Sequence, residues 1–315
     1  MSDFKRGQRA KQPNHIPLRG WWDIAKRIIK QMSRDNLSLV AAGVAFYALL
    51  AIFPAIAALV SVYAYFASPN DISAYLSQFM ALLPQSTQEI ILSQVSSLAQ
   101  KSQTSLSLSA LGTLLLTIWS SSKGSQALIT ACNISYQEYE KRSFFKAQLV
   151  RLLFSVGAIV VAVIALVIIG ILPLVLNLLG IKESIDFLIM LISWPLLALT
   201  FNFALLILYR YAPHRKAAKW RWVTVGSFTA TVLWIVASFG FSFYVSHFAS
   251  YNETYGSLGG VVIMLMWLFI SAYIIILGAT INAALEQQTA QDSTVGPDKK
   301  RGQRGAYVAD HLDTK

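Results

Sequence analysis

Residues 258–285, LGGVVIMLMWLFISAYIIILGATINAAL, form an apolar run without one charged side chain. A helix needs about 20 such residues to cross roughly 30 Å of hydrocarbon. The strands of a membrane barrel alternate apolar and polar residues over about 10 residues. The long apolar runs of this chain show no such alternation. The expected fold class is therefore all-α, a bundle of transmembrane helices. Six candidate spans cover residues 37–66, 106–122, 152–179, 187–209, 222–248 and 258–285.

The bulk composition agrees with a polytopic membrane protein. Of the 315 residues, 55% are hydrophobic and only 13% are charged, which is too apolar for a water-soluble domain of this length. The single cysteine, Cys132, excludes an intramolecular disulfide.

The basic residues predict the orientation of the bundle. All but two of the 26 lysines and arginines lie before the first span, in the second and fourth loops, or after the sixth span. The two exceptions are Lys101 and Lys182. Because basic residues stay on the cytoplasmic side, both termini are expected there. The net charge of +11 then follows from topology and requires no nucleic acid, and the expected partners are anionic lipid headgroups on the cytoplasmic face.

The segments outside the spans also carry patterns. Residues 1–19 and 287–315 are polar, and both are expected to be disordered tails, with the second cytoplasmic. Residues 20–35 predict an amphipathic helix on the membrane surface, and residues 67–105 predict an external helical cap. The stripe expected to face lipid in the first of these helices consists of Trp21, Ile24, Ala25, Ile28 and Met32.

Polar residues near the membrane are the candidates for a functional site. Lys123, Gln126 and Asn133 share one stripe of a helix expected to continue past the membrane as far as Glu140. Lys123 serves there as an interfacial anchor, or it faces an anionic lipid or solute. Asn202 and Asn282 lie inside spans, where they either hydrogen-bond to neighbouring helices or line a substrate path.

Small residues and prolines indicate how the helices pack. Small residues four apart allow close helix contacts, and the leading interpretation is contact within the chain, with contact between copies in a homo-oligomer as the alternative. These residues are Ala41 with Ala45 and Gly256 with Gly260. Prolines inside spans predict kinks, which occur both in gated transporters and in proteins that transport nothing. They are Pro54, Pro173 and Pro195.

Signs of catalysis are absent from the sequence. No aspartate or glutamate lies near the middle of a span, and the four histidines form no ligand pair at helical or loop spacing. No phosphate-binding loop, dinucleotide-binding motif or nucleophile elbow occurs. We therefore expect no catalytic residues, no metal and no cofactor.

Four segments in order resemble the YihY/virulence factor BrkB family of bacterial inner-membrane proteins, once labelled ribonuclease BN. The resemblance implies six helices, an inner-membrane location and roles in envelope integrity or in lipid or solute export. The chain departs from the family pattern at Thr280, usually acidic, and at Lys123, often arginine. The four segments are AAGVAFYALLAIFPAIAALVSVY (41–63), WSSSKGSQALITACNISYQEYEKRSFFK (119–146), RYAPHRKAAKWRWVTVGSFTATVLWIVASFGFSFYV (210–245) and YGSLGGVVIMLMWLFISAYIIILGATINAALE (255–286).

Three functions remain in view. The leading hypothesis is a transporter or translocation factor for a lipid or another anionic or amphiphilic envelope component. The alternative is a scaffold for envelope integrity that transports nothing. A membrane-tethered ribonuclease is the least supported, because phosphodiester hydrolysis of that type needs a cluster of metal-binding side chains.

Overall fold

The structure, a computed structural model, describes residues 6–66, 108–178, 185–247 and 257–312. In that part of the chain the regular elements are all helical, and extended backbone pairs only in an isolated antiparallel bridge between Ala218 and Thr294. The helices are η2 (Pro13–His15), α1 (Leu18–Arg34), α2 (Leu37–Phe66), α5 (Leu108–Ser135), α6 (Phe144–Leu178), α7 (Ile185–Tyr211), α8 (Trp220–His247), α10 (Ser257–Glu286) and α11 (Tyr307–Asp310).

Apolar composition makes several of these helices long enough to cross a membrane. Among the described residues, four segments meet this requirement: Phe144–Ala165, Ile192–Tyr211, Trp220–Ser246 and Gly259–Glu286. A bent pair, α1 with Leu37–Ile52, brings the number of spans to as many as five. The described residues thus confirm the predicted all-α fold and contain several candidate membrane spans.

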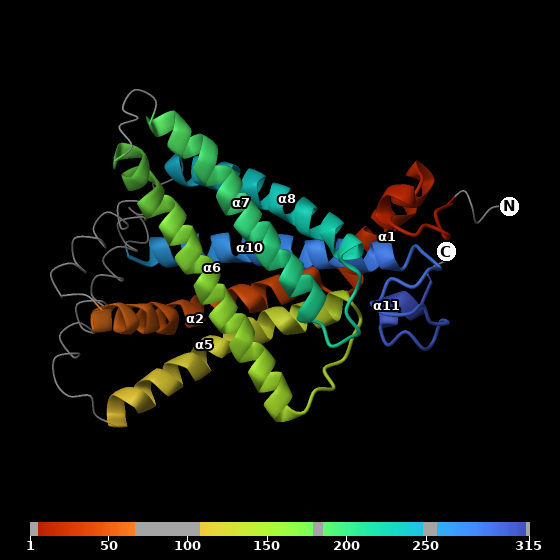
Figure 1. The fold of residues 1–315 in the computed structure, drawn as a ribbon, viewed down its shortest axis with the longest axis horizontal. Coiled ribbons are helices and arrows are strands. Elements are labelled where there is room, and N and C mark those ends of the chain that lie inside the picture. The colour runs from red at the N-terminus through yellow and green to blue at the C-terminus, as the bar shows by residue number, and fades with distance from the viewer. Residues whose placement is uncertain (1–5, 67–107, 179–184, 248–256, 313–315) are drawn as a thin grey trace.

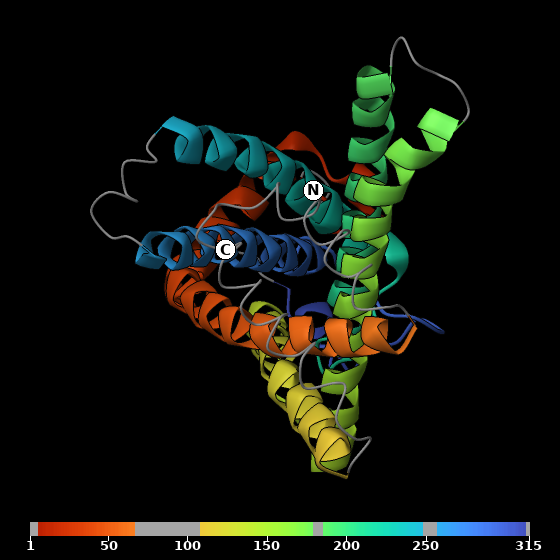
Figure 2. The same cartoon turned by 90° about the vertical axis from the view of Figure 1, so that its left-hand side faces the viewer.

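The six long helices pack in a ring. Following contacts from one helix to the next gives the order α2, α5, α6, α7, α8, α10 and back to α2, and α10 also contacts α5. In Figure 1, one end each of α2, α5, α8 and α10 gathers on the side where both termini lie, and the opposite ends spread apart. Figure 2 shows the same helices from the spread side.

Buried side chains concentrate in the half of the ring near the termini. In α8, Trp222 and Val223 are at most 1% exposed, whereas Phe239 and Phe243 further along are at least 50% exposed. In α10 the buried positions, apart from Gly259 and Gly260, run from Ala272 to the end of the helix. The spread half presents large apolar side chains outward, as a surface that contacts lipid would.

Small residues bring several helices into close contact within the chain. Ala41 and Ala45 are buried, and Ala41 shares a cluster with Ala131 of α5 and Ala272 of α10. Gly260 is buried near the start of α10, while Gly256 lies outside the described residues. The three prolines all fall inside helices that continue past them: Pro54 in α2, Pro173 in α6 and Pro195 in α7.

The two segments expected to be disordered tails are folded where the structure describes them. Residues 287–312 turn back over the helix ends, and Thr294 and Val308 there are at most 1% exposed. The amides and hydroxyls of this segment bond to residues 6–10; for example, the Ala290 amide donates to the Gln8 carbonyl at 2.6 Å. Residues 6–19 and 287–312 are thus folded, in contrast to the expected disorder. Hydrogen bonds hold these polar segments, and Ala10, Ile16 and Val308 also pack into the hydrophobic core.

Helix α1 forms where it was expected, but its faces differ from the prediction. Ile24 is buried against the bundle rather than turned toward lipid. Arg27, which is not part of the predicted apolar stripe, is 8% exposed and donates from Nη1 to the Ala284 carbonyl oxygen of α10 at 2.9 Å. That oxygen is one of the last carbonyls of α10, which lack partners within their own helix. The external cap predicted for residues 67–105 lies outside the described residues.

Helix α5 is shorter at its C-terminal end than predicted. It ends at Ser135, and Gln137 has a φ of 56°, in the left-handed region that breaks a helix. The polar stripe therefore does not continue on one helix to Glu140.

Candidate functional site

The end of the ring near the termini is closed by what we call the cap, made of residues 6–16, 136–143, 212–219 and 287–310. These segments are the N-terminal stretch, the loop between α5 and α6, the loop between α7 and α8, and the C-terminal stretch. They come from distant parts of the chain, yet backbone and side-chain hydrogen bonds join them.

A buried ion pair lies beneath the cap. Arg215 Nη2 donates to Glu286 Oε2 at 2.6 Å, and the two side chains are 2% and 0% exposed. The Ser293 hydroxyl donates to the same carboxylate oxygen, also at 2.6 Å. Glu286 therefore holds together the end of α10, the α7–α8 loop and the C-terminal stretch. Burial opposes the charge on Arg215, but the adjacent Glu286 carboxylate raises the pKa of this guanidinium.

The ion pair is not fully satisfied. Arg215 Nη1 and Glu286 Oε1 are buried and have no hydrogen-bond partner. The Arg215 guanidinium also lies over the ring of Tyr136, 4.8 Å from its centroid. Burial raises the pKa of the Tyr136 hydroxyl, so Tyr136 stays neutral beside the pair. Because desolvation offsets much of the attraction within a buried pair, this contact is a weak source of stability compared with apolar packing.

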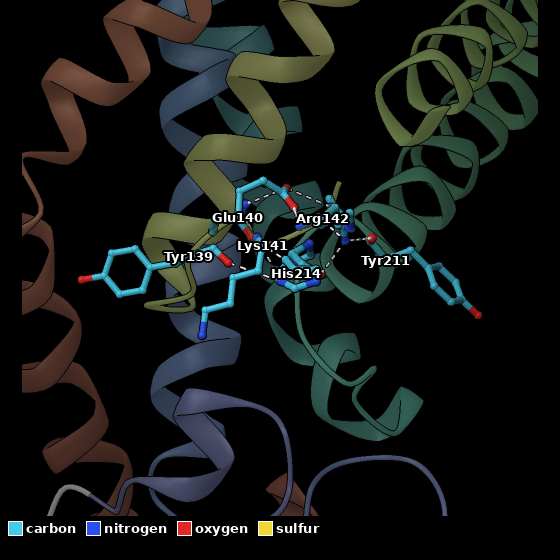
Figure 3. A network of polar contacts seen from close by, with 9 residues as sticks. Tyr139, Glu140, Lys141, Arg142, Tyr211 and His214 are labelled. Atoms are coloured by element: carbon cyan, nitrogen blue, oxygen red, sulfur yellow. Dashed lines mark hydrogen bonds and ion pairs between the residues drawn. The ribbon is translucent and has the colours of Figure 1, made fainter. Parts of the chain in front are cut away.

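A second polar network fastens the α5–α6 loop to the end of α7 (Figure 3). Arg142 donates from its guanidinium to the carbonyl oxygens of Tyr211, Ala212 and Pro213 at 3.1–3.4 Å. Helix α7 ends at Tyr211, where carbonyls lack partners within the helix, so Arg142 caps them. Glu140 orients Arg142 through an ion pair of 3.1 Å.

Asn133 and His214 belong to the same network. The His214 amide donates to Asn133 Oδ1 at 2.8 Å, which ties the last turn of α5 to the α7–α8 loop. His214 Nδ1 lies 3.3 Å from the carbonyl oxygen of Tyr139. Asn133 was predicted as a substrate-facing residue, and the structure places it next to the cap as a buried link between α5 and the α7–α8 loop.

The C-terminal stretch completes the cap. Around the Ala218–Thr294 bridge, the Lys219 amide donates to the Ser293 carbonyl at 2.8 Å and the Val295 amide to the Ala217 carbonyl at 2.9 Å. On the other side, the Tyr307 amide donates to Glu138 Oε1 at 2.6 Å. Burial raises the pKa of Glu138, although this hydrogen bond and nearby cations act in the opposite direction.

Arg304 holds the C-terminal stretch in its turn. The residue is 5% exposed, and its guanidinium donates to the carbonyl oxygens of Ala290, Gln291, Lys299 and Ala309 at 2.7–3.2 Å. One side chain thereby satisfies four backbone acceptors in a segment without long regular structure.

The other predicted site residues occupy separate places. Lys123 is exposed and Gln126 half-buried on α5, ahead of the cap. Asn202 of α7 donates to the Thr231 hydroxyl of α8 at 3.2 Å. Asn282 of α10 accepts from the Gly226 amide at 2.7 Å and donates to the Val223 carbonyl at 3.1 Å. Both asparagines therefore join helices.

Sequence reasoning missed the central residues of the cap. Arg215 was counted among the basic residues that predict topology, and Glu286 was only the residue that follows the sixth expected span, 258–285. The two are 71 positions apart, so no local pattern links them. The available signal was a lone carboxylate directly after an apolar run, on the side of the membrane that carries the basic loops.

The described residues offer limited chemistry. In that part of the chain, no three His, Cys, Asp or Glu side chains come together in a group that could hold a metal ion. Cys132 lies in α5 beyond residue 122, where the predicted span ends, and burial raises the pKa of its thiol to about 12. The thiol is therefore protonated at neutral pH and is a poor nucleophile.

The ring of apolar helices and its polar cap define a helical integral membrane protein. More narrowly, the chain belongs to the virulence factor BrkB family, whose family model matches residues 28–303. The resemblance drawn from the four sequence segments is thereby confirmed.

Three relatives illustrate the similarity. The ribonuclease-like protein YfkH of Bacillus subtilis is 33% identical over 181 residues, 56% of this chain and 65% of that protein. A UPF0761 membrane protein of Tolumonas auensis is 36% identical over 81 residues, 26% of each chain. Another, of Pseudoalteromonas atlantica, is 34% identical over 83 residues, 26% of this chain and 27% of that one. Each match spans less than two thirds of the relative, and no solved structure matches this chain.

Proposed function

We propose that this protein translocates a lipid or another anionic or amphiphilic component of the envelope across the bacterial inner membrane. All six long helices span the membrane in this proposal, and both termini are cytoplasmic. The cap is then the cytoplasmic gate. The observation that carries the proposal is the asymmetry of the ring, which is packed and closed by the cap at one end and spread at the other.

The chemistry of the cap supports a gate. Its segments are joined by hydrogen bonds and by the Arg215–Glu286 pair, while Ile16, Tyr136 and Val308 pack into the hydrophobic core. Polar contacts can be exchanged for water when the gate opens, with a smaller change in free energy than separating an equal apolar surface. The spread half carries exposed apolar side chains, which suit an amphiphile that keeps its acyl chains in lipid.

Transport can be measured with purified protein in liposomes that contain a fluorescent phosphatidylglycerol. A membrane-impermeant quencher reports how much of the label reaches the outer leaflet over time. We expect faster movement than in protein-free vesicles and a smaller effect for labelled phosphatidylcholine. Rates equal to protein-free vesicles for both lipids and for a soluble fluorescent anion would contradict the proposal.

A scaffold that transports nothing is the second candidate, and one observation favours it. Asn202 and Asn282, the intramembrane residues expected to line a path, are both engaged in hydrogen bonds between helices. A photoreactive side chain at the exposed Lys141 tests this function in cells. Capture of one defined envelope protein, together with liposomes that show no transport, would establish the scaffold.

The ribonuclease function in the name of YfkH gains little support here. A metal-dependent nuclease would need ligand groups that the described residues do not bring together. If the pure protein cleaved RNA only with added Mg²⁺ or Mn²⁺, the ribonuclease would be favoured over the transporter and the scaffold.

A further inference from the structure

Helix α1 has two faces of different character. Gly20, Ile24, Arg27 and Gln31 are buried against the end of the bundle. The opposite face carries Leu18, Trp22 and Ile29, whose exposed fractions are 88%, 64% and 69%. At 100° per residue these three positions fall within about 40° of one another, so they form one stripe.

Basic side chains border this exposed stripe. Lys26, Arg19 and Lys30 are exposed and follow the stripe around the helix in that order. Lys26 Nζ lies over the indole of Trp22, 5.3 Å from its centroid. A row of apolar side chains flanked by cations is the pattern of a helix that lies in the interface of an anionic membrane.

The connection to α2 gives α1 the orientation that such a role requires. Only Asp35 and Asn36 separate the two helices, and Asn36 adopts a φ of 48° at the turn. The axes of α1 and the following part of α2 differ by 63°. If α2 runs along the membrane normal, α1 lies closer to the membrane plane than to the normal.

The neighbouring surface of α2 is also apolar and exposed. Leu39, Phe46 and Leu50 share one side of α2, with exposed fractions of 74%, 52% and 49%. This is the kind of surface that an integral membrane protein turns toward lipid. The turn at Asp35 and Asn36 therefore joins α1 and its exposed stripe to a helix that also has an exposed apolar side.

We propose that the exposed face of α1, formed by Leu18, Trp22 and Ile29 with Arg19, Lys26 and Lys30, binds the interface of a bilayer that contains anionic phospholipid. Trp22 and Ile29 enter the region between headgroups and acyl chains, and the basic side chains contact lipid phosphates. The inference does not depend on transport, because a scaffold would use the same anchor. It replaces the stripe predicted from sequence, in which Ile24 faced lipid.

Spin labels test the depth of this face in the full-length protein. In a Cys132→Ala background, Leu18→Cys, Trp22→Cys and Ile29→Cys are labelled singly and reconstituted into vesicles of phosphatidylcholine with or without phosphatidylglycerol. Lys300→Cys, at an exposed position of the C-terminal stretch, is the matched control. Power saturation compares the access of oxygen, which enters lipid, with that of a water-soluble nickel complex.

The expected result is a severalfold higher ratio of oxygen to nickel access at positions 18, 22 and 29 than at position 300. Phosphatidylglycerol should raise the ratio further, and the triple substitution of Arg19, Lys26 and Lys30 by Gln should remove that increase. Ratios equal to that at position 300 would overturn the membrane contact. Ratios that do not respond to phosphatidylglycerol would overturn its preference for anionic lipid.

Discussion

Glu286 joins three segments of the chain through one carboxylate. Its Oε2 accepts from Arg215 and Ser293, while Oε1 has no partner. A buried charge of this kind is tolerated because the opposite charge lies 2.6 Å away. Removing either partner leaves the other ionised and without solvent, whereas removing both eliminates the desolvation penalty of the pair.

We therefore expect Glu286→Gln to destabilise the protein by about 3–5 kcal/mol, since Arg215 would remain charged and buried. The double variant Glu286→Gln/Arg215→Met should recover much of this loss. Thermal unfolding of purified protein in detergent measures both.

The matched control is Asp298→Asn. Asp298 pairs with Lys219 at 3.0 Å, but its side chain is 72% exposed. Exposed pairs contribute at most about 1 kcal/mol. A similar loss of stability from Asp298→Asn and Glu286→Gln would contradict the role given to the buried pair.

Asp292 gives the cap a dependence on pH. Burial alone would raise the pKa of this carboxyl, but hydrogen bonds from the amides of Lys299 and Thr294 outweigh it and lower the pKa. A carboxyl with a lowered folded-state pKa stabilises the fold fully above its unfolded pKa of about 3.9. This contribution is lost as the pH falls through the folded-state value.

The difference in unfolding temperature between the wild type and Asp292→Asn should accordingly be constant from pH 7 to about pH 5 and shrink below about pH 4. Thermal scans across this range check it. A difference that grew toward acid pH would have the wrong sign and would contradict the assigned hydrogen bonds.

At the scale of elements, α8 and α10 cross where glycines allow their backbones to approach. A Cβ at Gly226 would overlap the carbonyl oxygen of Gly278 and lie 2.5 Å from Cγ of Asn282. A Cβ at Gly278 would lie 2.8 Å from Cβ of Ala230. The close approach also lets the Asn282 side chain reach the Gly226 amide.

Gly226→Ala should therefore separate the two helices and destabilise the protein, by about 1–3 kcal/mol as for other overpacked sites. Gly240→Ala in the same helix is the control, because nothing lies within 4 Å of its added Cβ. Alanine there should stabilise α8 by up to about 1 kcal/mol. Equal effects of the two substitutions on thermal unfolding would show that the crossing tolerates a side chain.

Hydropathy predicted these helices well because apolar length alone marks a span. The expected range 258–285 became α10 at Ser257–Glu286, and 37–66 became α2 with the same bounds. The crossing point was not predicted, because only one of its glycines belongs to a small-residue pair: Gly226 has Ala230 four positions on, whereas Gly278 has Asn282 there. The folded ends were missed for a different reason. Arg304 is buried while it donates to backbone carbonyls, and Thr294 is buried while it donates to the Asp292 carboxylate. Hydropathy interprets such polar residues as solvent-exposed.

At the scale of the whole molecule, the cap connects parts of the chain that the ring alone would leave separate. Residues 6–16 contact the C-terminal stretch, which in turn contacts both loops that link α5 to α6 and α7 to α8. If the cap opens, the contacts between its segments must break together. The cap is therefore the part of the molecule whose motion separates a translocating protein from a static scaffold.

A disulfide across the cap tests this most directly. Ala218 and Thr294 face each other as a pair without mutual hydrogen bonds, the arrangement in which antiparallel Cα atoms come closest, about 4.5 Å apart. That separation suits a disulfide. Ala218→Cys/Thr294→Cys in the Cys132→Ala background should form it on oxidation, with Ala218→Cys alone as the control.

The measurement is the movement of labelled phosphatidylglycerol in liposomes by the double-cysteine protein, before oxidation, after oxidation and after subsequent reduction. If the cap is the gate, oxidation abolishes the movement, reduction restores it, and the single-cysteine control is unaffected. Lipid movement at an unchanged rate in the fully cross-linked protein would contradict the account.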